Sequence, residues 1–158
     1  TYKSNIYLCQ INYGDRNSDH PIEALGSFHG IFVPAISPTQ NNYAESYDFT
    51  EAGYVAMAKD FNEYLASFVK DGTPVSADAG VEWTPWTAKD PMTLVLDAKD
   101  DKAVVKMEDV STTNEAIIEA IESDKLDDAD KQTIVSTIMN GRWFSSDLDE
   151  HFKTPSLW

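Results

Sequence analysis

An amphipathic stretch at residues 51–71 constrains the fold more than any other part of this sequence. Its apolar side chains recur at spacings of three and four residues, which is the period of one helix face. They are Tyr54, Met57, Phe61, Tyr64, Leu65 and Phe68. The stretch therefore predicts a long helix whose apolar face packs into a core.

Residues at both ends of this stretch fit the limits of a helix. Asp48 or Thr50 is expected to cap its start, and Glu51 follows Asp48 by three residues, as in a capping box. At the other end, Gly72 suits a left-handed cap and Pro74 prevents continuation.

Strand-forming sequence lies on both sides of the predicted helix. Residues 4–13 predict a buried strand, in which Cys9 is a small buried hydrophobe rather than a reactive thiol. Residues 92–107 predict two strands joined by a polar turn at 98–101. Between these strands, residues 34–48 are expected to be irregular, and residues 80–91 to form a loop. Trp83 and Trp86 in that loop are expected to anchor it by packing; the alternative is that they line an acyl pocket.

The last third of the chain changes to helical patterns. Residues 112–124 and 127–141 are amphipathic, with Thr112 and Glu115 in capping-box positions and Gly141 at a C-cap position. Residues 142–158 predict an irregular tail whose aromatic side chains pack onto the body. The order of strand, helix, hairpin and two helices predicts an α/β fold with too few strands to close a sheet by itself. Because the chain begins almost within a strand, we expect a cleaved or truncated piece of a larger protein.

The charge of the chain excludes two classes of partner. Its 158 residues carry 12 Lys plus Arg against 27 Asp plus Glu, a formal net charge of −15. Such a field repels phosphate backbones and anionic membrane surfaces, so the sequence argues against nucleic-acid binding. No stretch approaches the roughly 20 apolar residues of a membrane helix, and no signal peptide opens the chain.

Few residues are candidates for catalysis. The histidines, His20, His29 and His151, are too scattered for a zinc motif, and residues 124–132 lack the glycine of a calcium loop, so no metal or cofactor is expected. No Gly-x-Ser-x-Gly nucleophile elbow occurs. His20 is expected to be exposed in a polar loop, and the carboxylates around His151 favour its charged form. His29 differs from both because it lies between Gly26 and Gly30, in a loop that must turn sharply.

Three segments, taken in order, resemble the type-B carboxylesterases, the family of cholinesterases and fungal lipases. "LGSFHG" at 25–30 resembles the family's histidine segment. "FNEYLASFVKDGTPV" at 61–75 is similar to its following helix, and "EWTPWTAKDPMTLVLDA" at 82–98 to its penultimate strand and the stretch before it. The resemblance covers about residues 1–110; residues 111–158 are not recognisable and carry no functional inference.

The resemblance implies that residues 1–158 are the C-terminal segment of one α/β-hydrolase domain: 1–110 the strand, histidine loop, helix and hairpin, and 111–158 the C-terminal helices and tail. In that fold the triad order is nucleophile, acid, histidine. This chain would therefore supply only His29, the general base and acid, and would be inactive without an N-terminal segment carrying the serine and a Glu or Asp. The resemblance further implies no cofactor, a lipid-like or sterol-like ester substrate, and secretion.

One residue departs from the family pattern. The family commonly has an acid three residues after the histidine, where this chain has Phe32. Two alternatives therefore stay open: an esterase-like interaction or adhesion module without catalysis, and an unrelated acidic α+β binding domain.

Overall fold

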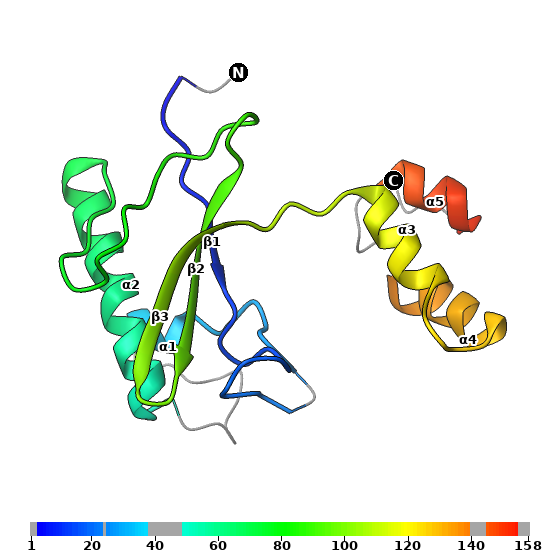
Figure 1. The fold of residues 1–158 in the computed structure, drawn as a ribbon, viewed down its shortest axis with the longest axis horizontal. Coiled ribbons are helices and arrows are strands. Elements are labelled where there is room, and N and C mark those ends of the chain that lie inside the picture. The colour runs from blue at the N-terminus through cyan, green and yellow to red at the C-terminus, as the bar shows by residue number, and fades with distance from the viewer. Residues whose placement is uncertain (1–2, 24, 38–48, 140–144, 155–158) are drawn as a thin grey trace. The chain divides into compact units, whose positions relative to one another are not determined.

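The computed structural model describes residues 3–23, 25–37, 49–139 and 145–154. The chain divides into two compact units, Thr1–Val110 and Ser111–Trp158. The first unit is a small mixed α/β unit whose elements are β1 (Cys9–Ile11), α1 (Val33–Ile36), α2 (Ala52–Asp71), β2 (Met92–Lys99) and β3 (Lys102–Asp109) (Figure 1). The predicted α/β class is confirmed at this level.

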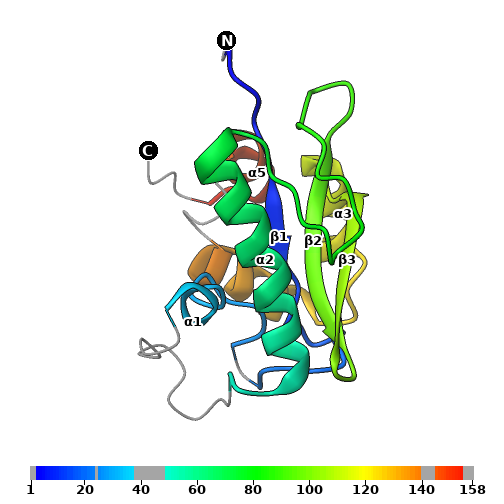
Figure 2. The same cartoon turned by 90° about the vertical axis from the view of Figure 1, so that its left-hand side faces the viewer.

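The three strands form one mixed sheet in the order β1-β2-β3. β1 pairs in parallel with β2, with Cys9 opposite Leu94, and β2 pairs antiparallel with β3, with Leu94 opposite Met107. Parallel neighbours need a crossover connection, and α2 provides it. Figure 2 shows α2 lying along one face of this sheet. The predicted hairpin at 92–107 is confirmed and extends to Asp109.

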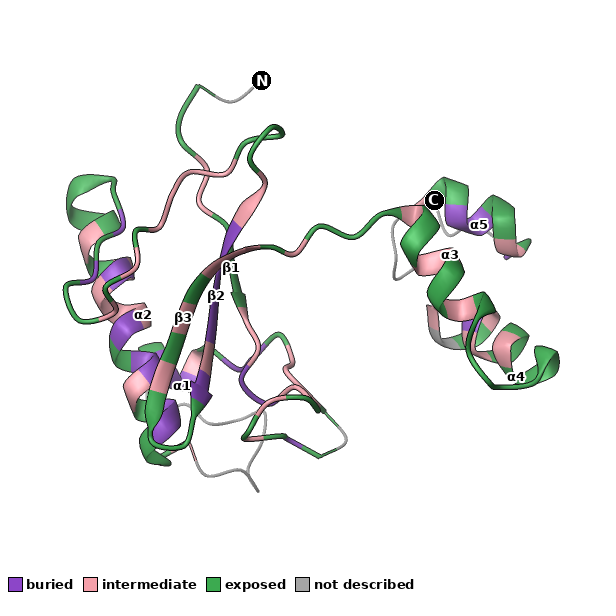
Figure 3. Ribbon diagram, in the orientation of Figure 1, coloured by how far each residue is buried: buried purple, intermediate pink, exposed green. Residues whose placement is uncertain are grey.

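The core lies between α2 and the sheet. Burial is concentrated on β2 and on the side of α2 that faces the strands (Figure 3). The side chains that are essentially inaccessible there are Tyr13, Tyr54, Met57, Tyr64, Leu94 and Leu96. Three members of the predicted apolar stripe, Tyr54, Met57 and Tyr64, are therefore core. Phe61 and Leu65 are half-buried, and Phe68, near the end of α2, is 43% exposed.

The ends of α2 differ in how well they were predicted. Gly72 is the C-cap, with a left-handed φ of 72°, as expected. The predicted N-cap at Thr50 is wrong, since the helix begins at Ala52 with Glu51 as N-cap and no side-chain cap. The Glu51 carboxylate instead accepts a hydrogen bond from the Tyr13 hydroxyl at 2.8 Å, so a tertiary contact replaces the local one. Asp48 lies outside the described residues.

The first strand also differs from its prediction. The strand covers only Cys9–Ile11 rather than residues 4–13, and Leu8, Cys9 and Gln10 are exposed rather than buried. Among the described strands β1 pairs only with β2, so it is an edge strand and lacks the cover that a central strand receives. In the segment expected to be irregular, Val33–Ile36 forms the short helix α1, which Pro34 suits because proline is tolerated in a first helical turn.

The second unit is helical: α3 (Asn114–Glu122), α4 (Asp128–Thr133), the π-helix η1 (Ile134–Met139) and α5 (Ser146–Phe152). The helical predictions for this region are confirmed, but the N-cap of α3 is Thr113 rather than Thr112, and its hydroxyl accepts from the Ala116 amide at 3.2 Å. The tail, expected to be irregular, contains α5, which the Ser145 hydroxyl caps by accepting from the Leu148 amide. Gly141 lies outside the described residues.

A buried carboxylate on α2 leads to a pH-dependent prediction. Asp60 is 8% exposed, and burial first, then the negative charge of Glu63, raise its pKa above the ordinary value, against a smaller opposing effect of Lys59. A raised folded-state pKa means that ionising Asp60 costs the folded state more than the unfolded state. The penalty is absent below the unfolded pKa of about 3.9 and complete above the folded value.

We therefore expect Asp60→Asn to raise the urea midpoint at pH 7, and this gain to shrink as the pH falls toward about 4. Urea unfolding of both proteins across that range measures the difference. Asp71→Asn, at the exposed end of the same helix, is the control and should change little. A gain from Asp60→Asn that is equal at every pH would contradict the argument.

Candidate functional site

The loop that carries His29 is held at both ends. The Ser27 hydroxyl donates to the carbonyl of Ile11, the last residue of β1, and so ties the loop to the carboxyl end of that strand. The Tyr54 hydroxyl on α2 donates to the Ile31 carbonyl at 2.7 Å. His29 lies between these two anchors. Gly26, just before them, has a left-handed φ of 62°, as the predicted sharp turn requires.

His29 is an exposed residue at the wall of a cavity of about 440 Å³. The cavity is lined by Cys9, Ile11, Ser27, Phe28, His29, Ile31, Phe32 and Phe61. Most of these side chains are apolar, and they come from β1, the loop and α2. A mostly apolar hollow with a few polar groups is typical of sites for small molecules. Phe32, at the position where an acid would be usual, is 40% exposed and adds to the apolar lining.

Cys9 shares this cavity, and its surroundings favour the protonated thiol. The residue as a whole is exposed, whereas desolvation by the atoms around the thiol raises its pKa to about 12. A thiol with that pKa is protonated at neutral pH, and only the thiolate is strongly nucleophilic. The interpretation of Cys9 as unreactive therefore agrees with its surroundings, although its predicted burial is wrong.

His20 belongs to a different constellation. Its Nδ1 lies 3.2 Å from the Glu51 carboxylate, its Nε2 lies 2.8 Å from the Asp100 carbonyl oxygen, and its ring stacks on Tyr13 at 5.3 Å. Its side chain is 19% exposed, so the prediction of a solvent-exposed His20 is wrong. The ring therefore lies between the start of α2 and the β2–β3 turn, with one acceptor oxygen beside each nitrogen.

His151 lies in the helical unit, where its Nε2 is 2.8 Å from Glu122 of α3. Sequence neighbours were expected to influence it, but this carboxylate is 29 residues away in the chain. The pair joins α3 to α5 at an exposed position, where ion pairs contribute little to stability. Of the three histidines, the one on the cavity is His29.

Sequence reasoning missed the other parts of this site. Phe61 was identified only as core, yet it forms part of the cavity wall, and Tyr54 was identified only as a stripe residue, yet it anchors the loop. A tyrosine within an apolar helical stripe indicates that its hydroxyl will bind a partner outside the helix, because a buried hydroxyl requires a hydrogen bond. Which partner it finds depends on the tertiary fold.

The described residues show neither a metal cluster nor a membrane span. No three His, Cys, Asp or Glu side chains gather there as a set of metal ligands. None of the helices in the described ranges is long and apolar enough to cross a bilayer. The candidate site is a mostly apolar cavity with His29, Ser27 and Cys9 on its wall. No protein-family model matches this chain, and neither a curated protein nor a solved structure matches it.

Proposed function

We propose that this chain is the C-terminal part of a serine carboxylic-ester hydrolase with an α/β-hydrolase fold, and that His29 is its general base and acid. The observation that carries the proposal is the exposed imidazole at the wall of a 440 Å³ apolar cavity. Its loop is tied to the carboxyl end of a strand in a parallel pair, which is where ligands bind in open α/β sheets. The ordered resemblance of residues 1–110 to type-B carboxylesterases supports the same assignment.

The chemistry assigns each partner one role. The imidazole of His29 takes the proton of a serine hydroxyl as the serine oxygen attacks the ester carbonyl carbon. When the tetrahedral intermediate collapses, the imidazolium gives that proton to the departing alcohol. Water then repeats the cycle on the acyl-serine and releases the carboxylic acid. The apolar lining would hold the hydrocarbon part of a lipid-like or sterol-like ester.

The serine and the triad carboxylate are proposed to come from an N-terminal segment of the same enzyme. Two features of β1 support this partner. Its apolar neighbour Leu8 is 38% exposed, and β1 pairs on one side only among the described strands. A parallel edge strand of this kind can accept a further strand. We also propose that the enzyme is secreted, as the resemblance implies.

One observation favours a second candidate, an esterase-like interaction module without catalysis. Phe32 presents an apolar side chain at the cavity, at a position where the family commonly has an acid. A module that retains the fold for binding has no need of that charge.

Labelling with a fluorophosphonate separates the two candidates. In the longer polypeptide that carries this chain, we expect covalent labelling of a serine outside residues 1–158, whereas the chain alone takes up no label and hydrolyses no p-nitrophenyl butyrate. Peptide mapping of the labelled protein identifies the serine. Absence of label on the longer polypeptide would favour the interaction module, and a stable, active 17.6 kDa monomer would contradict the need for a partner.

A further inference from the structure

Among the described strands β3 is the edge strand on the far side of the sheet from β1 (Figure 2). A two-residue turn joins it to β2, since Lys99 pairs with Lys102. The residues that close such a turn are hydrogen-bonded to each other, and bonded and non-bonded pairs then alternate along the hairpin. The N–H and C=O groups of Ala103, Val105 and Met107 therefore face away from β2. In the described part of the chain these groups make no backbone hydrogen bond outside the hairpin. A further strand can add here.

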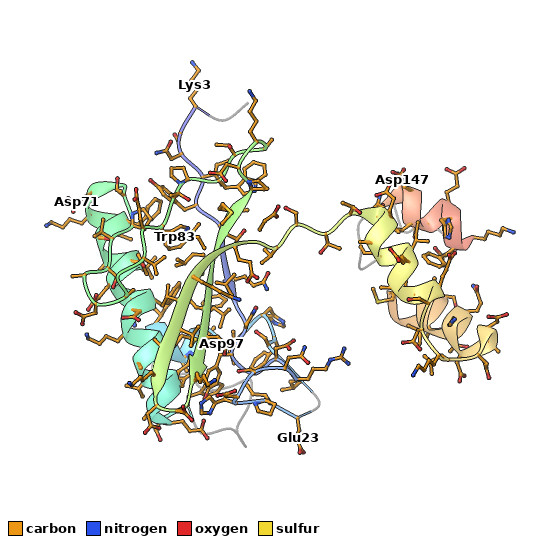
Figure 4. All side chains as sticks on the ribbon, in the orientation of Figure 1. Lys3, Glu23, Asp71, Trp83, Asp97 and Asp147 are labelled. Atoms are coloured by element: carbon orange, nitrogen blue, oxygen red, sulfur yellow. The ribbon has the colours of Figure 1, made fainter. Side chains whose placement is uncertain are left out.

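The side chains of β3 alternate between two faces of the sheet. Those packed against the core under α2 are apolar: Ala103, Val105 and Met107. Those on the opposite face are Lys102, Val104, Lys106 and Glu108, of which Lys106 and Glu108 form an ion pair at 2.7 Å. Figure 4 labels Asp97, which lies opposite Val104 across the hairpin. Two lysines and two acids make β3 neutral in a chain of net charge −15, so the strand itself does not repel a second copy of the chain.

We propose that this chain forms a two-fold symmetric dimer in which β3 pairs antiparallel with β3 of a second copy, centred on Val105. Symmetry of this kind presents the same patch on both copies. On the core face, Val105 then meets its own counterpart and Ala103 meets Met107 of the second copy. On the opposite face, Lys102 meets Glu108 of the second copy, and the two-fold axis repeats this pair. Apolar side chains thus meet apolar ones, and each pair across Lys102 and Glu108 joins opposite charges.

The charges favour this register over its neighbours. A shift by one residue would place core-face side chains opposite those of the other face, which the pleat does not allow. A shift by two residues toward the turn sets Lys102 opposite Lys106, and a shift by two the other way sets the two copies of Lys106 opposite each other. Across a strand pair, opposite charges are favourable and like charges unfavourable. Lysines commonly protect an edge strand from pairing, and here they disfavour the competing registers.

The proposed register has one unfavourable contact. Asp101 of the turn lies opposite Asp109 of the second copy, and both residues are exposed, where salt weakens their repulsion. This contact provides a test, because removing one of the two charges should strengthen the dimer. The inference does not rest on the proposed esterase function, since the N-terminal segment proposed there would add to β1, at the other edge of the sheet.

Sedimentation equilibrium of the chain over a range of concentrations measures the dimer. We expect a reversible equilibrium between 17.6 kDa and twice that mass, and a weak one, because a single strand pair is smaller than a standard interface. Lys102→Glu or Glu108→Lys alone creates two like-charged pairs and should raise the dimer Kd about tenfold or more. The double variant should restore the dimer. Lys70→Glu, the same change of charge at the exposed end of α2, is the matched control and should change little.

Two further variants test the backbone pairing and the register. Val105→Pro removes an N–H that faces away from β2, so it should abolish the dimer and keep the hairpin. Asp101→Asn removes the like-charged contact and should lower the dimer Kd, a gain that misfolding does not imitate.

Three results would overturn the proposal. A wild-type chain that stays monomeric at the highest concentration would leave β3 to a different partner or to none. A dimer that survives Val105→Pro would place the contact elsewhere, for example at β1. A double charge reversal that does not restore the dimer would contradict the register. If Val105→Pro loses its far-UV circular dichroism, the charge reversal and Asp101→Asn still decide between these results.

Discussion

In the esterase proposed above, replacing His29 by glutamine is expected to lower kcat for ester hydrolysis by about 10⁶-fold. Glutamine keeps a polar side chain of similar reach but cannot take the serine proton, so the nucleophile stays a weakly reactive alcohol. The loss should appear in kcat, with KM nearly unchanged, because the apolar lining that would hold the substrate is intact. Initial rates with p-nitrophenyl butyrate measure both constants.

The chain offers a matched control for this experiment. His151 is likewise exposed but lies in the helical unit, where it pairs with Glu122. His151→Gln is therefore expected to leave kcat and KM unchanged. Near-normal hydrolysis by His29→Gln would remove this residue from catalysis and favour the non-catalytic module.

Replacing Gly53 by alanine is expected to destabilise the first unit by about 1–3 kcal/mol, the range for overpacking a filled site. In most helices this change is stabilising, by roughly 0.5–1 kcal/mol, because alanine is the better helix former. At Gly53, however, an added Cβ would lie 2.5 Å from the Asp100 carbonyl oxygen and 3.1 Å from His20 Nε2. The Asp100 oxygen belongs to the backbone and already lies 2.8 Å from His20 Nε2, so moving it away from an added Cβ would disturb that contact and the β2–β3 turn.

The sign of this effect is the test, and urea unfolding measures it. Ala66→Gly, at an exposed position of the same helix, reports the ordinary propensity effect and should cost roughly 0.5–1 kcal/mol. Both changes are therefore expected to destabilise, although they exchange the same two residues in opposite directions. An increase in stability from Gly53→Ala would show that α2 does not approach the β2–β3 turn closely.

The elements that could be predicted are those whose signals are local. The apolar stripe on α2 and the left-handed C-cap at Gly72 depend on residues within one or two helical turns. The hairpin of β2 and β3 depends on a polar turn between two apolar runs. Helix starts were less predictable, because a cap has competing partners. The Glu51 carboxylate accepts a hydrogen bond from Tyr13, which is 38 residues away, and does not cap the backbone of its own helix.

The candidate site likewise has one part that the sequence could predict and one that it could not. His29 could be selected from the sequence because its flanking glycines and the resemblance of "LGSFHG" mark a special loop. The cavity beside it could not, since its lining comes from β1, the loop and α2, and no local pattern shows which side chains from such distant segments share one hollow. Nor could the exposure of Cys9 be predicted, because a strand's apolar composition does not reveal whether both of its edges are paired.

The sequence by itself determined the α/β class, the long helix with its apolar face, the hairpin and the acidic character that argues against nucleic acid. Only the tertiary structure decided that His20 lies against Glu51 and Asp100 and that His29 stands at an apolar cavity. The physical reason is the range of the forces involved. Periodicity and capping act between residues a few positions apart, whereas His20 and Asp100 are 80 positions apart and meet only after the sheet and α2 have packed.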